Sequence, residues 1–154
     1  MLVAFDIDRI SRIADRWWKH PILSKRKAIL EPALNAFNAN DSVSCIKNLA
    51  TEIEGIIRDA HIADVGASAK IGDLLRYAID RGIKKSESDT TLFFPREFLR
   101  YLNSCVFASF DPLSPTSTKL SRHSASHGAA LGSTYTQMRA LQTILTVDQL
   151  AFFL

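Results

Sequence analysis

Apolar residues recur every three or four positions along most of the chain, which is the spacing of an amphipathic α-helix. No segment shows the strict alternation of apolar and polar residues that is typical of a half-buried β-strand. The pattern therefore predicts an all-α fold, an up-and-down bundle of about five or six helices. The helical spacing covers residues 7–20, 22–37, 42–61, 71–82, 93–110 and 134–154.

Several residues indicate where these helices begin and end. Asn40 and Asp41 are suited to cap the third helix, and Thr134 with Gln137 forms a capping-box pattern before the last one. His20 precedes a proline and should leave the helical conformation, while Pro32 lies inside the second pattern and predicts a kink or two short helices. Connections are expected at residues 63–69, 84–91 and 111–118, with the fourth helix ending at 81–82.

The last helix has apolar residues on more than one face, which is more than a single core contact requires. We therefore expect a dimer interface close to it. Asp148 lies within this apolar pattern and needs a polar partner.

Length and composition describe one globular domain over residues 1–154, which is either a whole protein or the C-terminal part of a longer one. With 47% hydrophobic and 23% charged residues, such a chain buries about 70 per cent of its unfolded surface. Cys45 and Cys105 are far apart and form no close pair, which favours reduced thiols and a cytoplasmic setting. No signal peptide and no membrane-length apolar run is present, so we expect no membrane partner.

The segment from Ser121 to Gly132 (Ser-Arg-His-Ser-Ala-Ser-His-Gly-Ala-Ala-Leu-Gly) concentrates the candidate chemistry. Arg122 carries a planar guanidinium that matches a phosphate with two parallel hydrogen bonds. His123 and His127 carry side chains that titrate near neutrality and can give or take a proton. This combination predicts chemistry on a phosphate group.

An arginine, a polar neighbour and a histidine four to six residues after the arginine resemble the signature of the HEPN superfamily. Arg122, His123 and His127 match these three positions, and Gly128 follows the histidine as it often does in that superfamily. The segment 50–57 (Ala-Thr-Glu-Ile-Glu-Gly-Ile-Ile), after the Trp and His-Pro-Ile-Leu of 17–23, is similar to a prokaryotic branch of HEPN-like proteins.

The resemblance implies a small all-helical domain that cleaves RNA as a homodimer, without a metal or another cofactor. It implies that His127 is the general base or acid, that Arg122 stabilises charge on the phosphate, and that His123 positions the substrate or transfers a second proton. On a regular helix Arg122 and His127 would lie about 140 degrees apart, and two copies of the motif at a dimer interface resolve this geometry. The implied setting is a toxin or phage-defence system, with an antitoxin or a nucleotidyltransferase as partner.

Other residues are expected to support this site. Glu54 and Ser126 are candidates for orienting the arginine or a histidine, and the other interpretation of Glu54 is a surface carboxylate paired with Arg58, four residues later. The net charge is +3 with a pI near 9.0, and residues 16–27 contain cations but no acid. The candidate RNA-binding residues are Lys25, Arg26, Lys27 and Lys119.

The sequence leaves other interpretations open. For residues 16–27 the alternative is that the two tryptophans belong to the core and the lysines solvate a helix surface. His123 and His127 have a spacing that suits zinc, with His61, Cys105 or Asp111 as further ligands. Two further interpretations are a non-catalytic HEPN-like module that binds RNA or a nucleotide, and a dimerisation bundle with no site at all.

Overall fold

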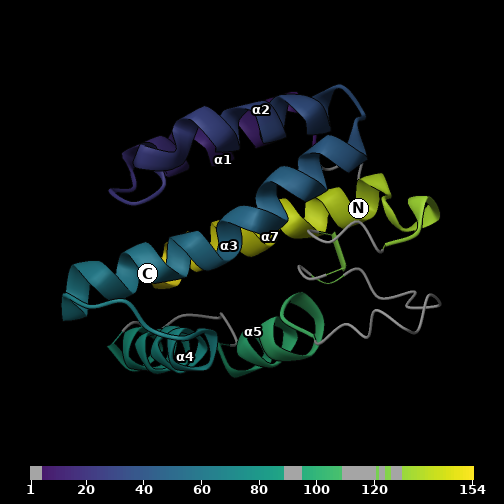
Figure 1. Cartoon of the computed structure of the whole chain (residues 1–154). Helices are drawn as coiled ribbons and strands as arrows, with labels where there is room; N and C mark the ends of the chain where they lie inside the picture. Colours follow the sequence, from purple (N-terminus) through teal and green to yellow (C-terminus); the bar gives the residue numbers. More distant parts are fainter. Residues whose placement is uncertain (1–4, 89–94, 109–120, 122–123, 126–129) are drawn as a thin grey trace.

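A computed structural model of the chain describes residues 5–88, 95–108, 121, 124–125 and 130–154. These residues form a helical bundle, and no strand occurs among them, which confirms the predicted all-α class (Figure 1). The α-helices are α1 (Ile7–Lys19), α2 (Lys27–Asn38), α3 (Ser42–Val65), α4 (Ile71–Ser88), α5 (Pro95–Tyr101) and α7 (Gln137–Phe153). Short helical turns occur at η2 (Ser24–Arg26), η3 (Leu102–Val106, a π-helix) and η4 (Gly132–Thr134).

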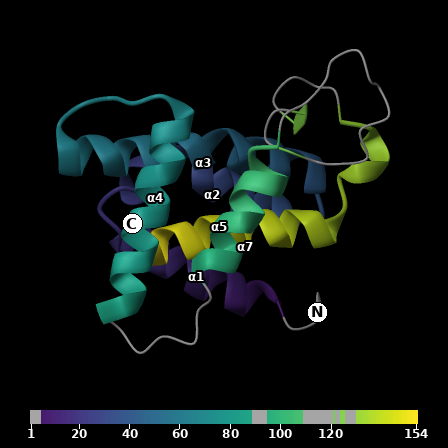
Figure 2. The ribbon, with the colours of Figure 1, turned by 90° about the horizontal axis from the view of Figure 1, so that it is seen from below.

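Helix α7 occupies the centre of the bundle and packs against α1, α2, α3 and α4 (Figure 2). Its buried positions therefore lie on more than one face, and they are Ala140, Leu141, Ile144, Thr146, Val147, Leu150 and Phe153. The surplus of apolar residues that suggested a dimer interface is thus used inside a single chain. The dimer remains a prediction that depends on the family resemblance.

The caps and breaks at both ends of the first helices follow the sequence pattern. Asp6 accepts a hydrogen bond from the Arg9 amide at the start of α1, and Asp41 accepts one from the Ser44 amide at the start of α3. His20 has an extended backbone before Pro21, as predicted. These local signals are strong because each involves only residues of one helical turn.

Two helices continue through residues that were expected to interrupt them. Helix α2 runs as one helix through Pro32, whose exposed position leaves the unpaired carbonyl of the preceding turn open to water. Helix α4 runs through Gly82 to Ser88, so the predicted end at 81–82 and the predicted loop from residue 84 are wrong. A Cβ built on Gly82 would lie 3.5 Å from the ring of Phe153, which is an ordinary contact and places this residue on the face of α4 toward α7.

Three other boundaries also differ from the prediction. Helix α3 extends to Val65 and ends at Gly66, which has a left-handed backbone (φ 76°), so residues 63–65 belong to the helix. The helix predicted over 93–110 consists of α5 followed by the π-helical turn η3, which ends at Val106, before the predicted end. Residues 93–94 and 109–110 lie outside the described residues. The last helix begins after Thr136, whose side chain accepts from the Arg139 amide, and Thr134 belongs to η4 instead.

Candidate functional site

Ser121 and Ser124, the first and fourth residues of the motif segment, are buried and bonded to each other, with 4% and 1% of their surfaces exposed. The Ser121 amide donates to Ser124 Oγ (2.9 Å), and the Ser124 amide donates to Ser121 Oγ (3.2 Å). This reciprocal arrangement is that of a capping box. The Ala125 amide also donates to the Ser121 carbonyl at 3.0 Å, and the Ala130 amide donates to the Ser124 carbonyl at 3.2 Å.

A small cavity of about 40 Å³ lies beside these anchored residues. Ser121 and Ala125 form one side of it, and residues of α3, α7 and the α5–η3 segment form the others. These other lining residues are Ile46, Ala50, Ile53, Tyr101, Val106, Thr143 and Thr146. The described part of the motif segment therefore packs against α3, α7 and the α5–η3 segment.

The residues predicted to carry the chemistry fall outside the part of the chain that the structure describes. They are Arg122, His123, Ser126 and His127, together with the predicted RNA-binding residue Lys119. Their catalytic roles remain predictions. What the structure adds is the position of their neighbours, Ser121, Ser124 and Ala125, against α3 and α7.

Glu54 lies on α3 directly after Ile53, one of the residues beneath the motif segment. Its carboxylate forms an ion pair with Arg58, four residues later, and its side chain is only 14% exposed. The pairing with Arg58 is the one that the helical spacing predicts. The proposed role of Glu54 in orienting Arg122 or a histidine stays a prediction, because those side chains are not among the described ones.

Arg26, predicted to contact RNA, has its guanidinium engaged by two carboxylates of α3. Nη1 bonds to Glu52, while Nε and Nη2 bond to Asp59 Oδ2 at 3.0 and 2.8 Å. Burial disfavours the charged form of Arg26, but the hydrogen bonds and charges of Glu52 and Asp59 outweigh this effect and raise its pKa. The structure thus gives Arg26 a role in joining the η2 turn to α3.

Gly55 makes this arrangement possible. A Cβ at position 55 would lie 2.6 Å from Arg26 Nη1, so only glycine lets the guanidinium rest on the α3 backbone. Glu52, Gly55 and Asp59 are three and four residues apart, on one face of the helix. This spacing is visible in the sequence and is the signal that could have identified the cluster.

The two lysines beside Arg26 differ in their surroundings. Lys25 is exposed. Lys27 lies 5.3 Å above the ring of partly buried Trp18 and 3.6 Å from Glu31. Trp17 is completely buried in the core, as the packing interpretation predicts, whereas Trp18 is only partly buried and packs against the core. RNA binding by Lys25 and Lys27 stays a prediction.

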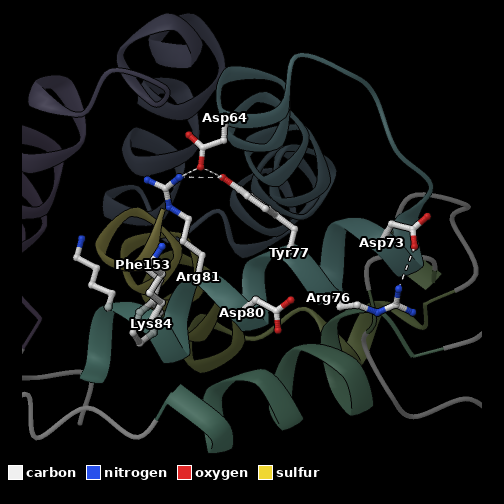
Figure 3. A pocket seen from close by; sticks show the side chains of 9 residues that line it. Asp64, Asp73, Arg76, Tyr77, Asp80, Arg81, Lys84 and Phe153 are labelled. Carbon is white, nitrogen blue, oxygen red and sulfur yellow. Dashed lines mark hydrogen bonds and ion pairs between the residues drawn. The ribbon is translucent and has the colours of Figure 1, made fainter. Parts of the chain in front are cut away.

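A second cavity, of about 770 Å³, lies along α4 beside the end of α7 (Figure 3). Arg81 and Tyr77 both point toward Asp64, and the Tyr77 hydroxyl donates to Asp64 at 2.7 Å. Elsewhere on the rim Arg76 lies 3.5 Å from Asp73. Because these carboxylates neutralise cations of the same rim, the cavity has no strong preference for one sign of charge.

His20 lies at the end of α1, near the cations of this second cavity. Its Nδ1 accepts a 3.3 Å hydrogen bond from the Ile22 amide. Burial lowers the pKa of His20, and the positive charges of Lys85 and Arg81 lower it further. The neutral imidazole is therefore the favoured form in the folded protein.

The cysteines have contrasting environments, and neither forms a disulfide. Burial raises the pKa of the Cys45 thiol to about 12, with a smaller contribution from Asp41. Cys105 is exposed. Burial and the raised pKa make the Cys45 thiol unreactive in the folded protein.

Among the described residues no three histidine, cysteine or acidic side chains are grouped to hold a metal ion. His123 and His127, on which the zinc interpretation depends, and Asp111, one of its possible further ligands, lie outside the described residues. Within the described part of the chain, every helix is too short or too polar to cross a membrane. Comparisons of the chain with protein-family models, curated proteins and solved structures found no match.

Proposed function

We propose that the protein is a metal-independent endoribonuclease of the HEPN type, with Arg122, His123 and His127 as its catalytic residues. One histidine takes the proton from a ribose 2′-hydroxyl, and the 2′-oxygen attacks the adjacent phosphorus. The bond from phosphorus to the 5′-oxygen breaks, and that oxygen receives a proton from the other histidine. The products carry a 2′,3′-cyclic phosphate and a 5′-hydroxyl. Arg122 stabilises the charge that develops on the phosphate oxygens.

The observation that carries this proposal is the reciprocal hydrogen bonding of buried Ser121 and Ser124 on either side of Arg122 and His123. A solvent-facing turn with no role gains little from two buried serines beside its charged residues. A catalytic arginine and histidine, by contrast, need neighbours that are fixed by packing and hydrogen bonds. The all-α fold is also the one that the resemblance implies.

The proposal includes a homodimer in which two motif segments line one cleft. It places the protein in a toxin or phage-defence setting, where RNA cleavage halts growth and an antitoxin or nucleotidyltransferase controls it. Light scattering should then give a mass of about twice the 17.2 kDa of the chain. A monomer that cleaves RNA would contradict the shared cleft but not the chemistry.

The experiment incubates the protein with mixed RNA in excess EDTA and identifies the product ends. The test variants are Arg122→Ala, His123→Ala and His127→Ala. The matched controls are Arg76→Ala and His61→Ala, which remove the same side-chain types from α4 and α3. Cleavage by wild type and controls, lost in the Arg122, His123 and His127 variants with unchanged circular dichroism, would support the proposal.

Two outcomes would contradict it. Equal cleavage by all the proteins would show that the activity belongs to a contaminant or to another site. Tight RNA binding without cleavage by wild type would favour the alternative, a non-catalytic HEPN-like module that binds RNA or a nucleotide. In that case the Arg122→Ala protein should lose affinity, because the motif would be the anion-binding site.

A further inference from the structure

Three arginines of α1 face a groove between α1 and α7 with a volume of about 340 Å³. The groove also includes Phe5, Leu145 and Asp148. We propose that this groove, which we call the arginine groove, binds the phosphate backbone of single-stranded RNA. This inference rests on the proposed function and adds a second contact with the substrate.

The arginines are regularly spaced along the helix. Arg9, Arg12 and Arg16 are three and four residues apart, so they lie on one face at intervals of about 4.5 and 6 Å along the axis. Single-stranded RNA carries one negative charge on every nucleotide. A row of cations at regular intervals is therefore suited to such a chain.

Two of the three guanidiniums are held in place. Arg16 donates to the Arg12 carbonyl at 3.3 Å and to Asp148 Oδ2 at 2.8 Å. The Cζ atom of Arg9 lies 4.4 Å from the centroid of the Phe5 ring. Arginine side chains fixed in this way lose less conformational freedom on binding a phosphate than mobile lysines do.

The groove has a clear sign of charge, unlike the cavity along α4. Its lining residues include three arginines and one carboxylate, Asp148, which gives them a formal charge of +2. Arg12, between the two fixed arginines, is exposed. The excess charge and the planar guanidinium geometry both favour phosphate as the bound group.

The arginine groove and the motif segment lie on opposite sides of α7. Leu145 and Asp148 face the groove, whereas Thr143 and Thr146 line the small cavity beneath Ser121. Because α7 is enclosed by other helices, an RNA strand that contacts both must pass around the outside of the bundle. The groove therefore holds nucleotides that flank the cleaved bond, and it contributes affinity without taking part in the reaction.

The test measures binding of a labelled single-stranded RNA by fluorescence anisotropy at several salt concentrations. All proteins carry His127→Ala, so that the RNA stays intact. Arg9→Ala/Arg12→Ala is compared with Lys70→Ala/Arg76→Ala, which removes two exposed cations near α4, on the other side of the bundle (Figure 1). The groove variant should bind about tenfold more weakly, and its log–log salt slope should fall by about 1.4, as expected for two lost phosphate contacts. The control should change little.

An unchanged affinity in the groove variant, or an equal loss in both, would overturn the inference. Competition for the labelled RNA by polyglutamate, as effective as by unlabelled RNA, would also overturn it, because the groove would then suit an acidic protein partner. If the protein cleaves RNA but binds it independently of Arg9 and Arg12, the proposed function stands and the inference about the groove is wrong. If the protein binds RNA through the groove but never cleaves it, the inference about the groove stands and the proposed ribonuclease function is wrong.

Discussion

The indole Nε1 of Trp17 donates a 3.0 Å hydrogen bond to Oδ1 of Asp148, which joins α1 to α7. Trp17 is completely buried, and the second oxygen of Asp148 accepts from Arg16 at 2.8 Å. Each carboxylate oxygen thus has a partner on α1. Asp148, an acid inside the apolar pattern of α7, therefore has the polar partners that it requires.

Replacing Asp148 with alanine should destabilise the protein by about 1–3 kcal/mol, because the indole N–H of Trp17 would be left without an acceptor. Asp148→Asn keeps an acceptor oxygen and should cost less. Arg16→Ala removes only an ion pair whose arginine is 58% exposed, so its effect should stay below about 1 kcal/mol. Urea denaturation followed by circular dichroism gives the three values, and a larger loss for Arg16→Ala than for Asp148→Ala would contradict the assignment.

Gly55→Ala should destabilise the protein although alanine is the better helix former. The new Cβ would lie within 3 Å of the Arg26 guanidinium, so Arg26 must move and lose its bonds to Glu52 and Asp59. We expect a net loss of about 1–3 kcal/mol in the free energy of unfolding. Gly72→Ala is the matched control, because nothing lies within 4 Å of its Cβ and it should be neutral or stabilising by up to about 1 kcal/mol.

His20 should make stability depend on pH. Its pKa in the folded protein lies below the ordinary value of 6.5, so the unfolded chain binds the proton more readily. Stability should therefore be lost as the pH falls through about 6.5 and toward the lowered value. In urea titrations at a series of pH values, His20→Asn should lose less stability over this range than wild type does. Parallel curves for the two proteins would show that His20 titrates alike in both states.

Ser124→Ala should weaken the proposed ribonuclease without unfolding the bundle. The change removes one half of the reciprocal bonding with Ser121 and leaves the Ser121 amide without an acceptor in a buried position. We expect a cleavage rate reduced by about tenfold or more, since the geometry of the motif would be less well fixed. Ser133→Ala, at an exposed serine of η4, should cleave at the wild-type rate. Equal rates for Ser124→Ala and wild type would remove the main support for the site.

The sequence predicted most of the helices but misplaced the ends that depend on contacts between helices. Asp41 and the His20–Pro21 pair act within one turn, and the helix ends that they predict are present. Gly82 indicated an end on local grounds, yet α4 continues to Ser88, with Gly82 beside the ring of Phe153 from α7. Such a contact between distant segments leaves no periodic signal.

For the candidate site too, the sequence identified some features and the contacts between helices decided others. Arg122, His123 and His127 were identified from their chemistry and spacing alone, and their roles remain predictions. The roles of other charged residues depended on distant partners. Arg26 seemed free for RNA as one of a run of cations, but Glu52 and Asp59 engage it. Conversely, Arg9, Arg12 and Arg16 line a groove only because α7 lies beside α1.

The sequence by itself determined the helical class, the first caps and the segment where phosphate chemistry is expected, because periodicity, capping and side-chain chemistry are local properties. Only the tertiary structure decided that α7 is central, that its apolar faces are buried within one chain, and which charges are paired. The physical reason is that burial and ion pairing depend on which helices lie side by side, and one helical period is compatible with many such arrangements.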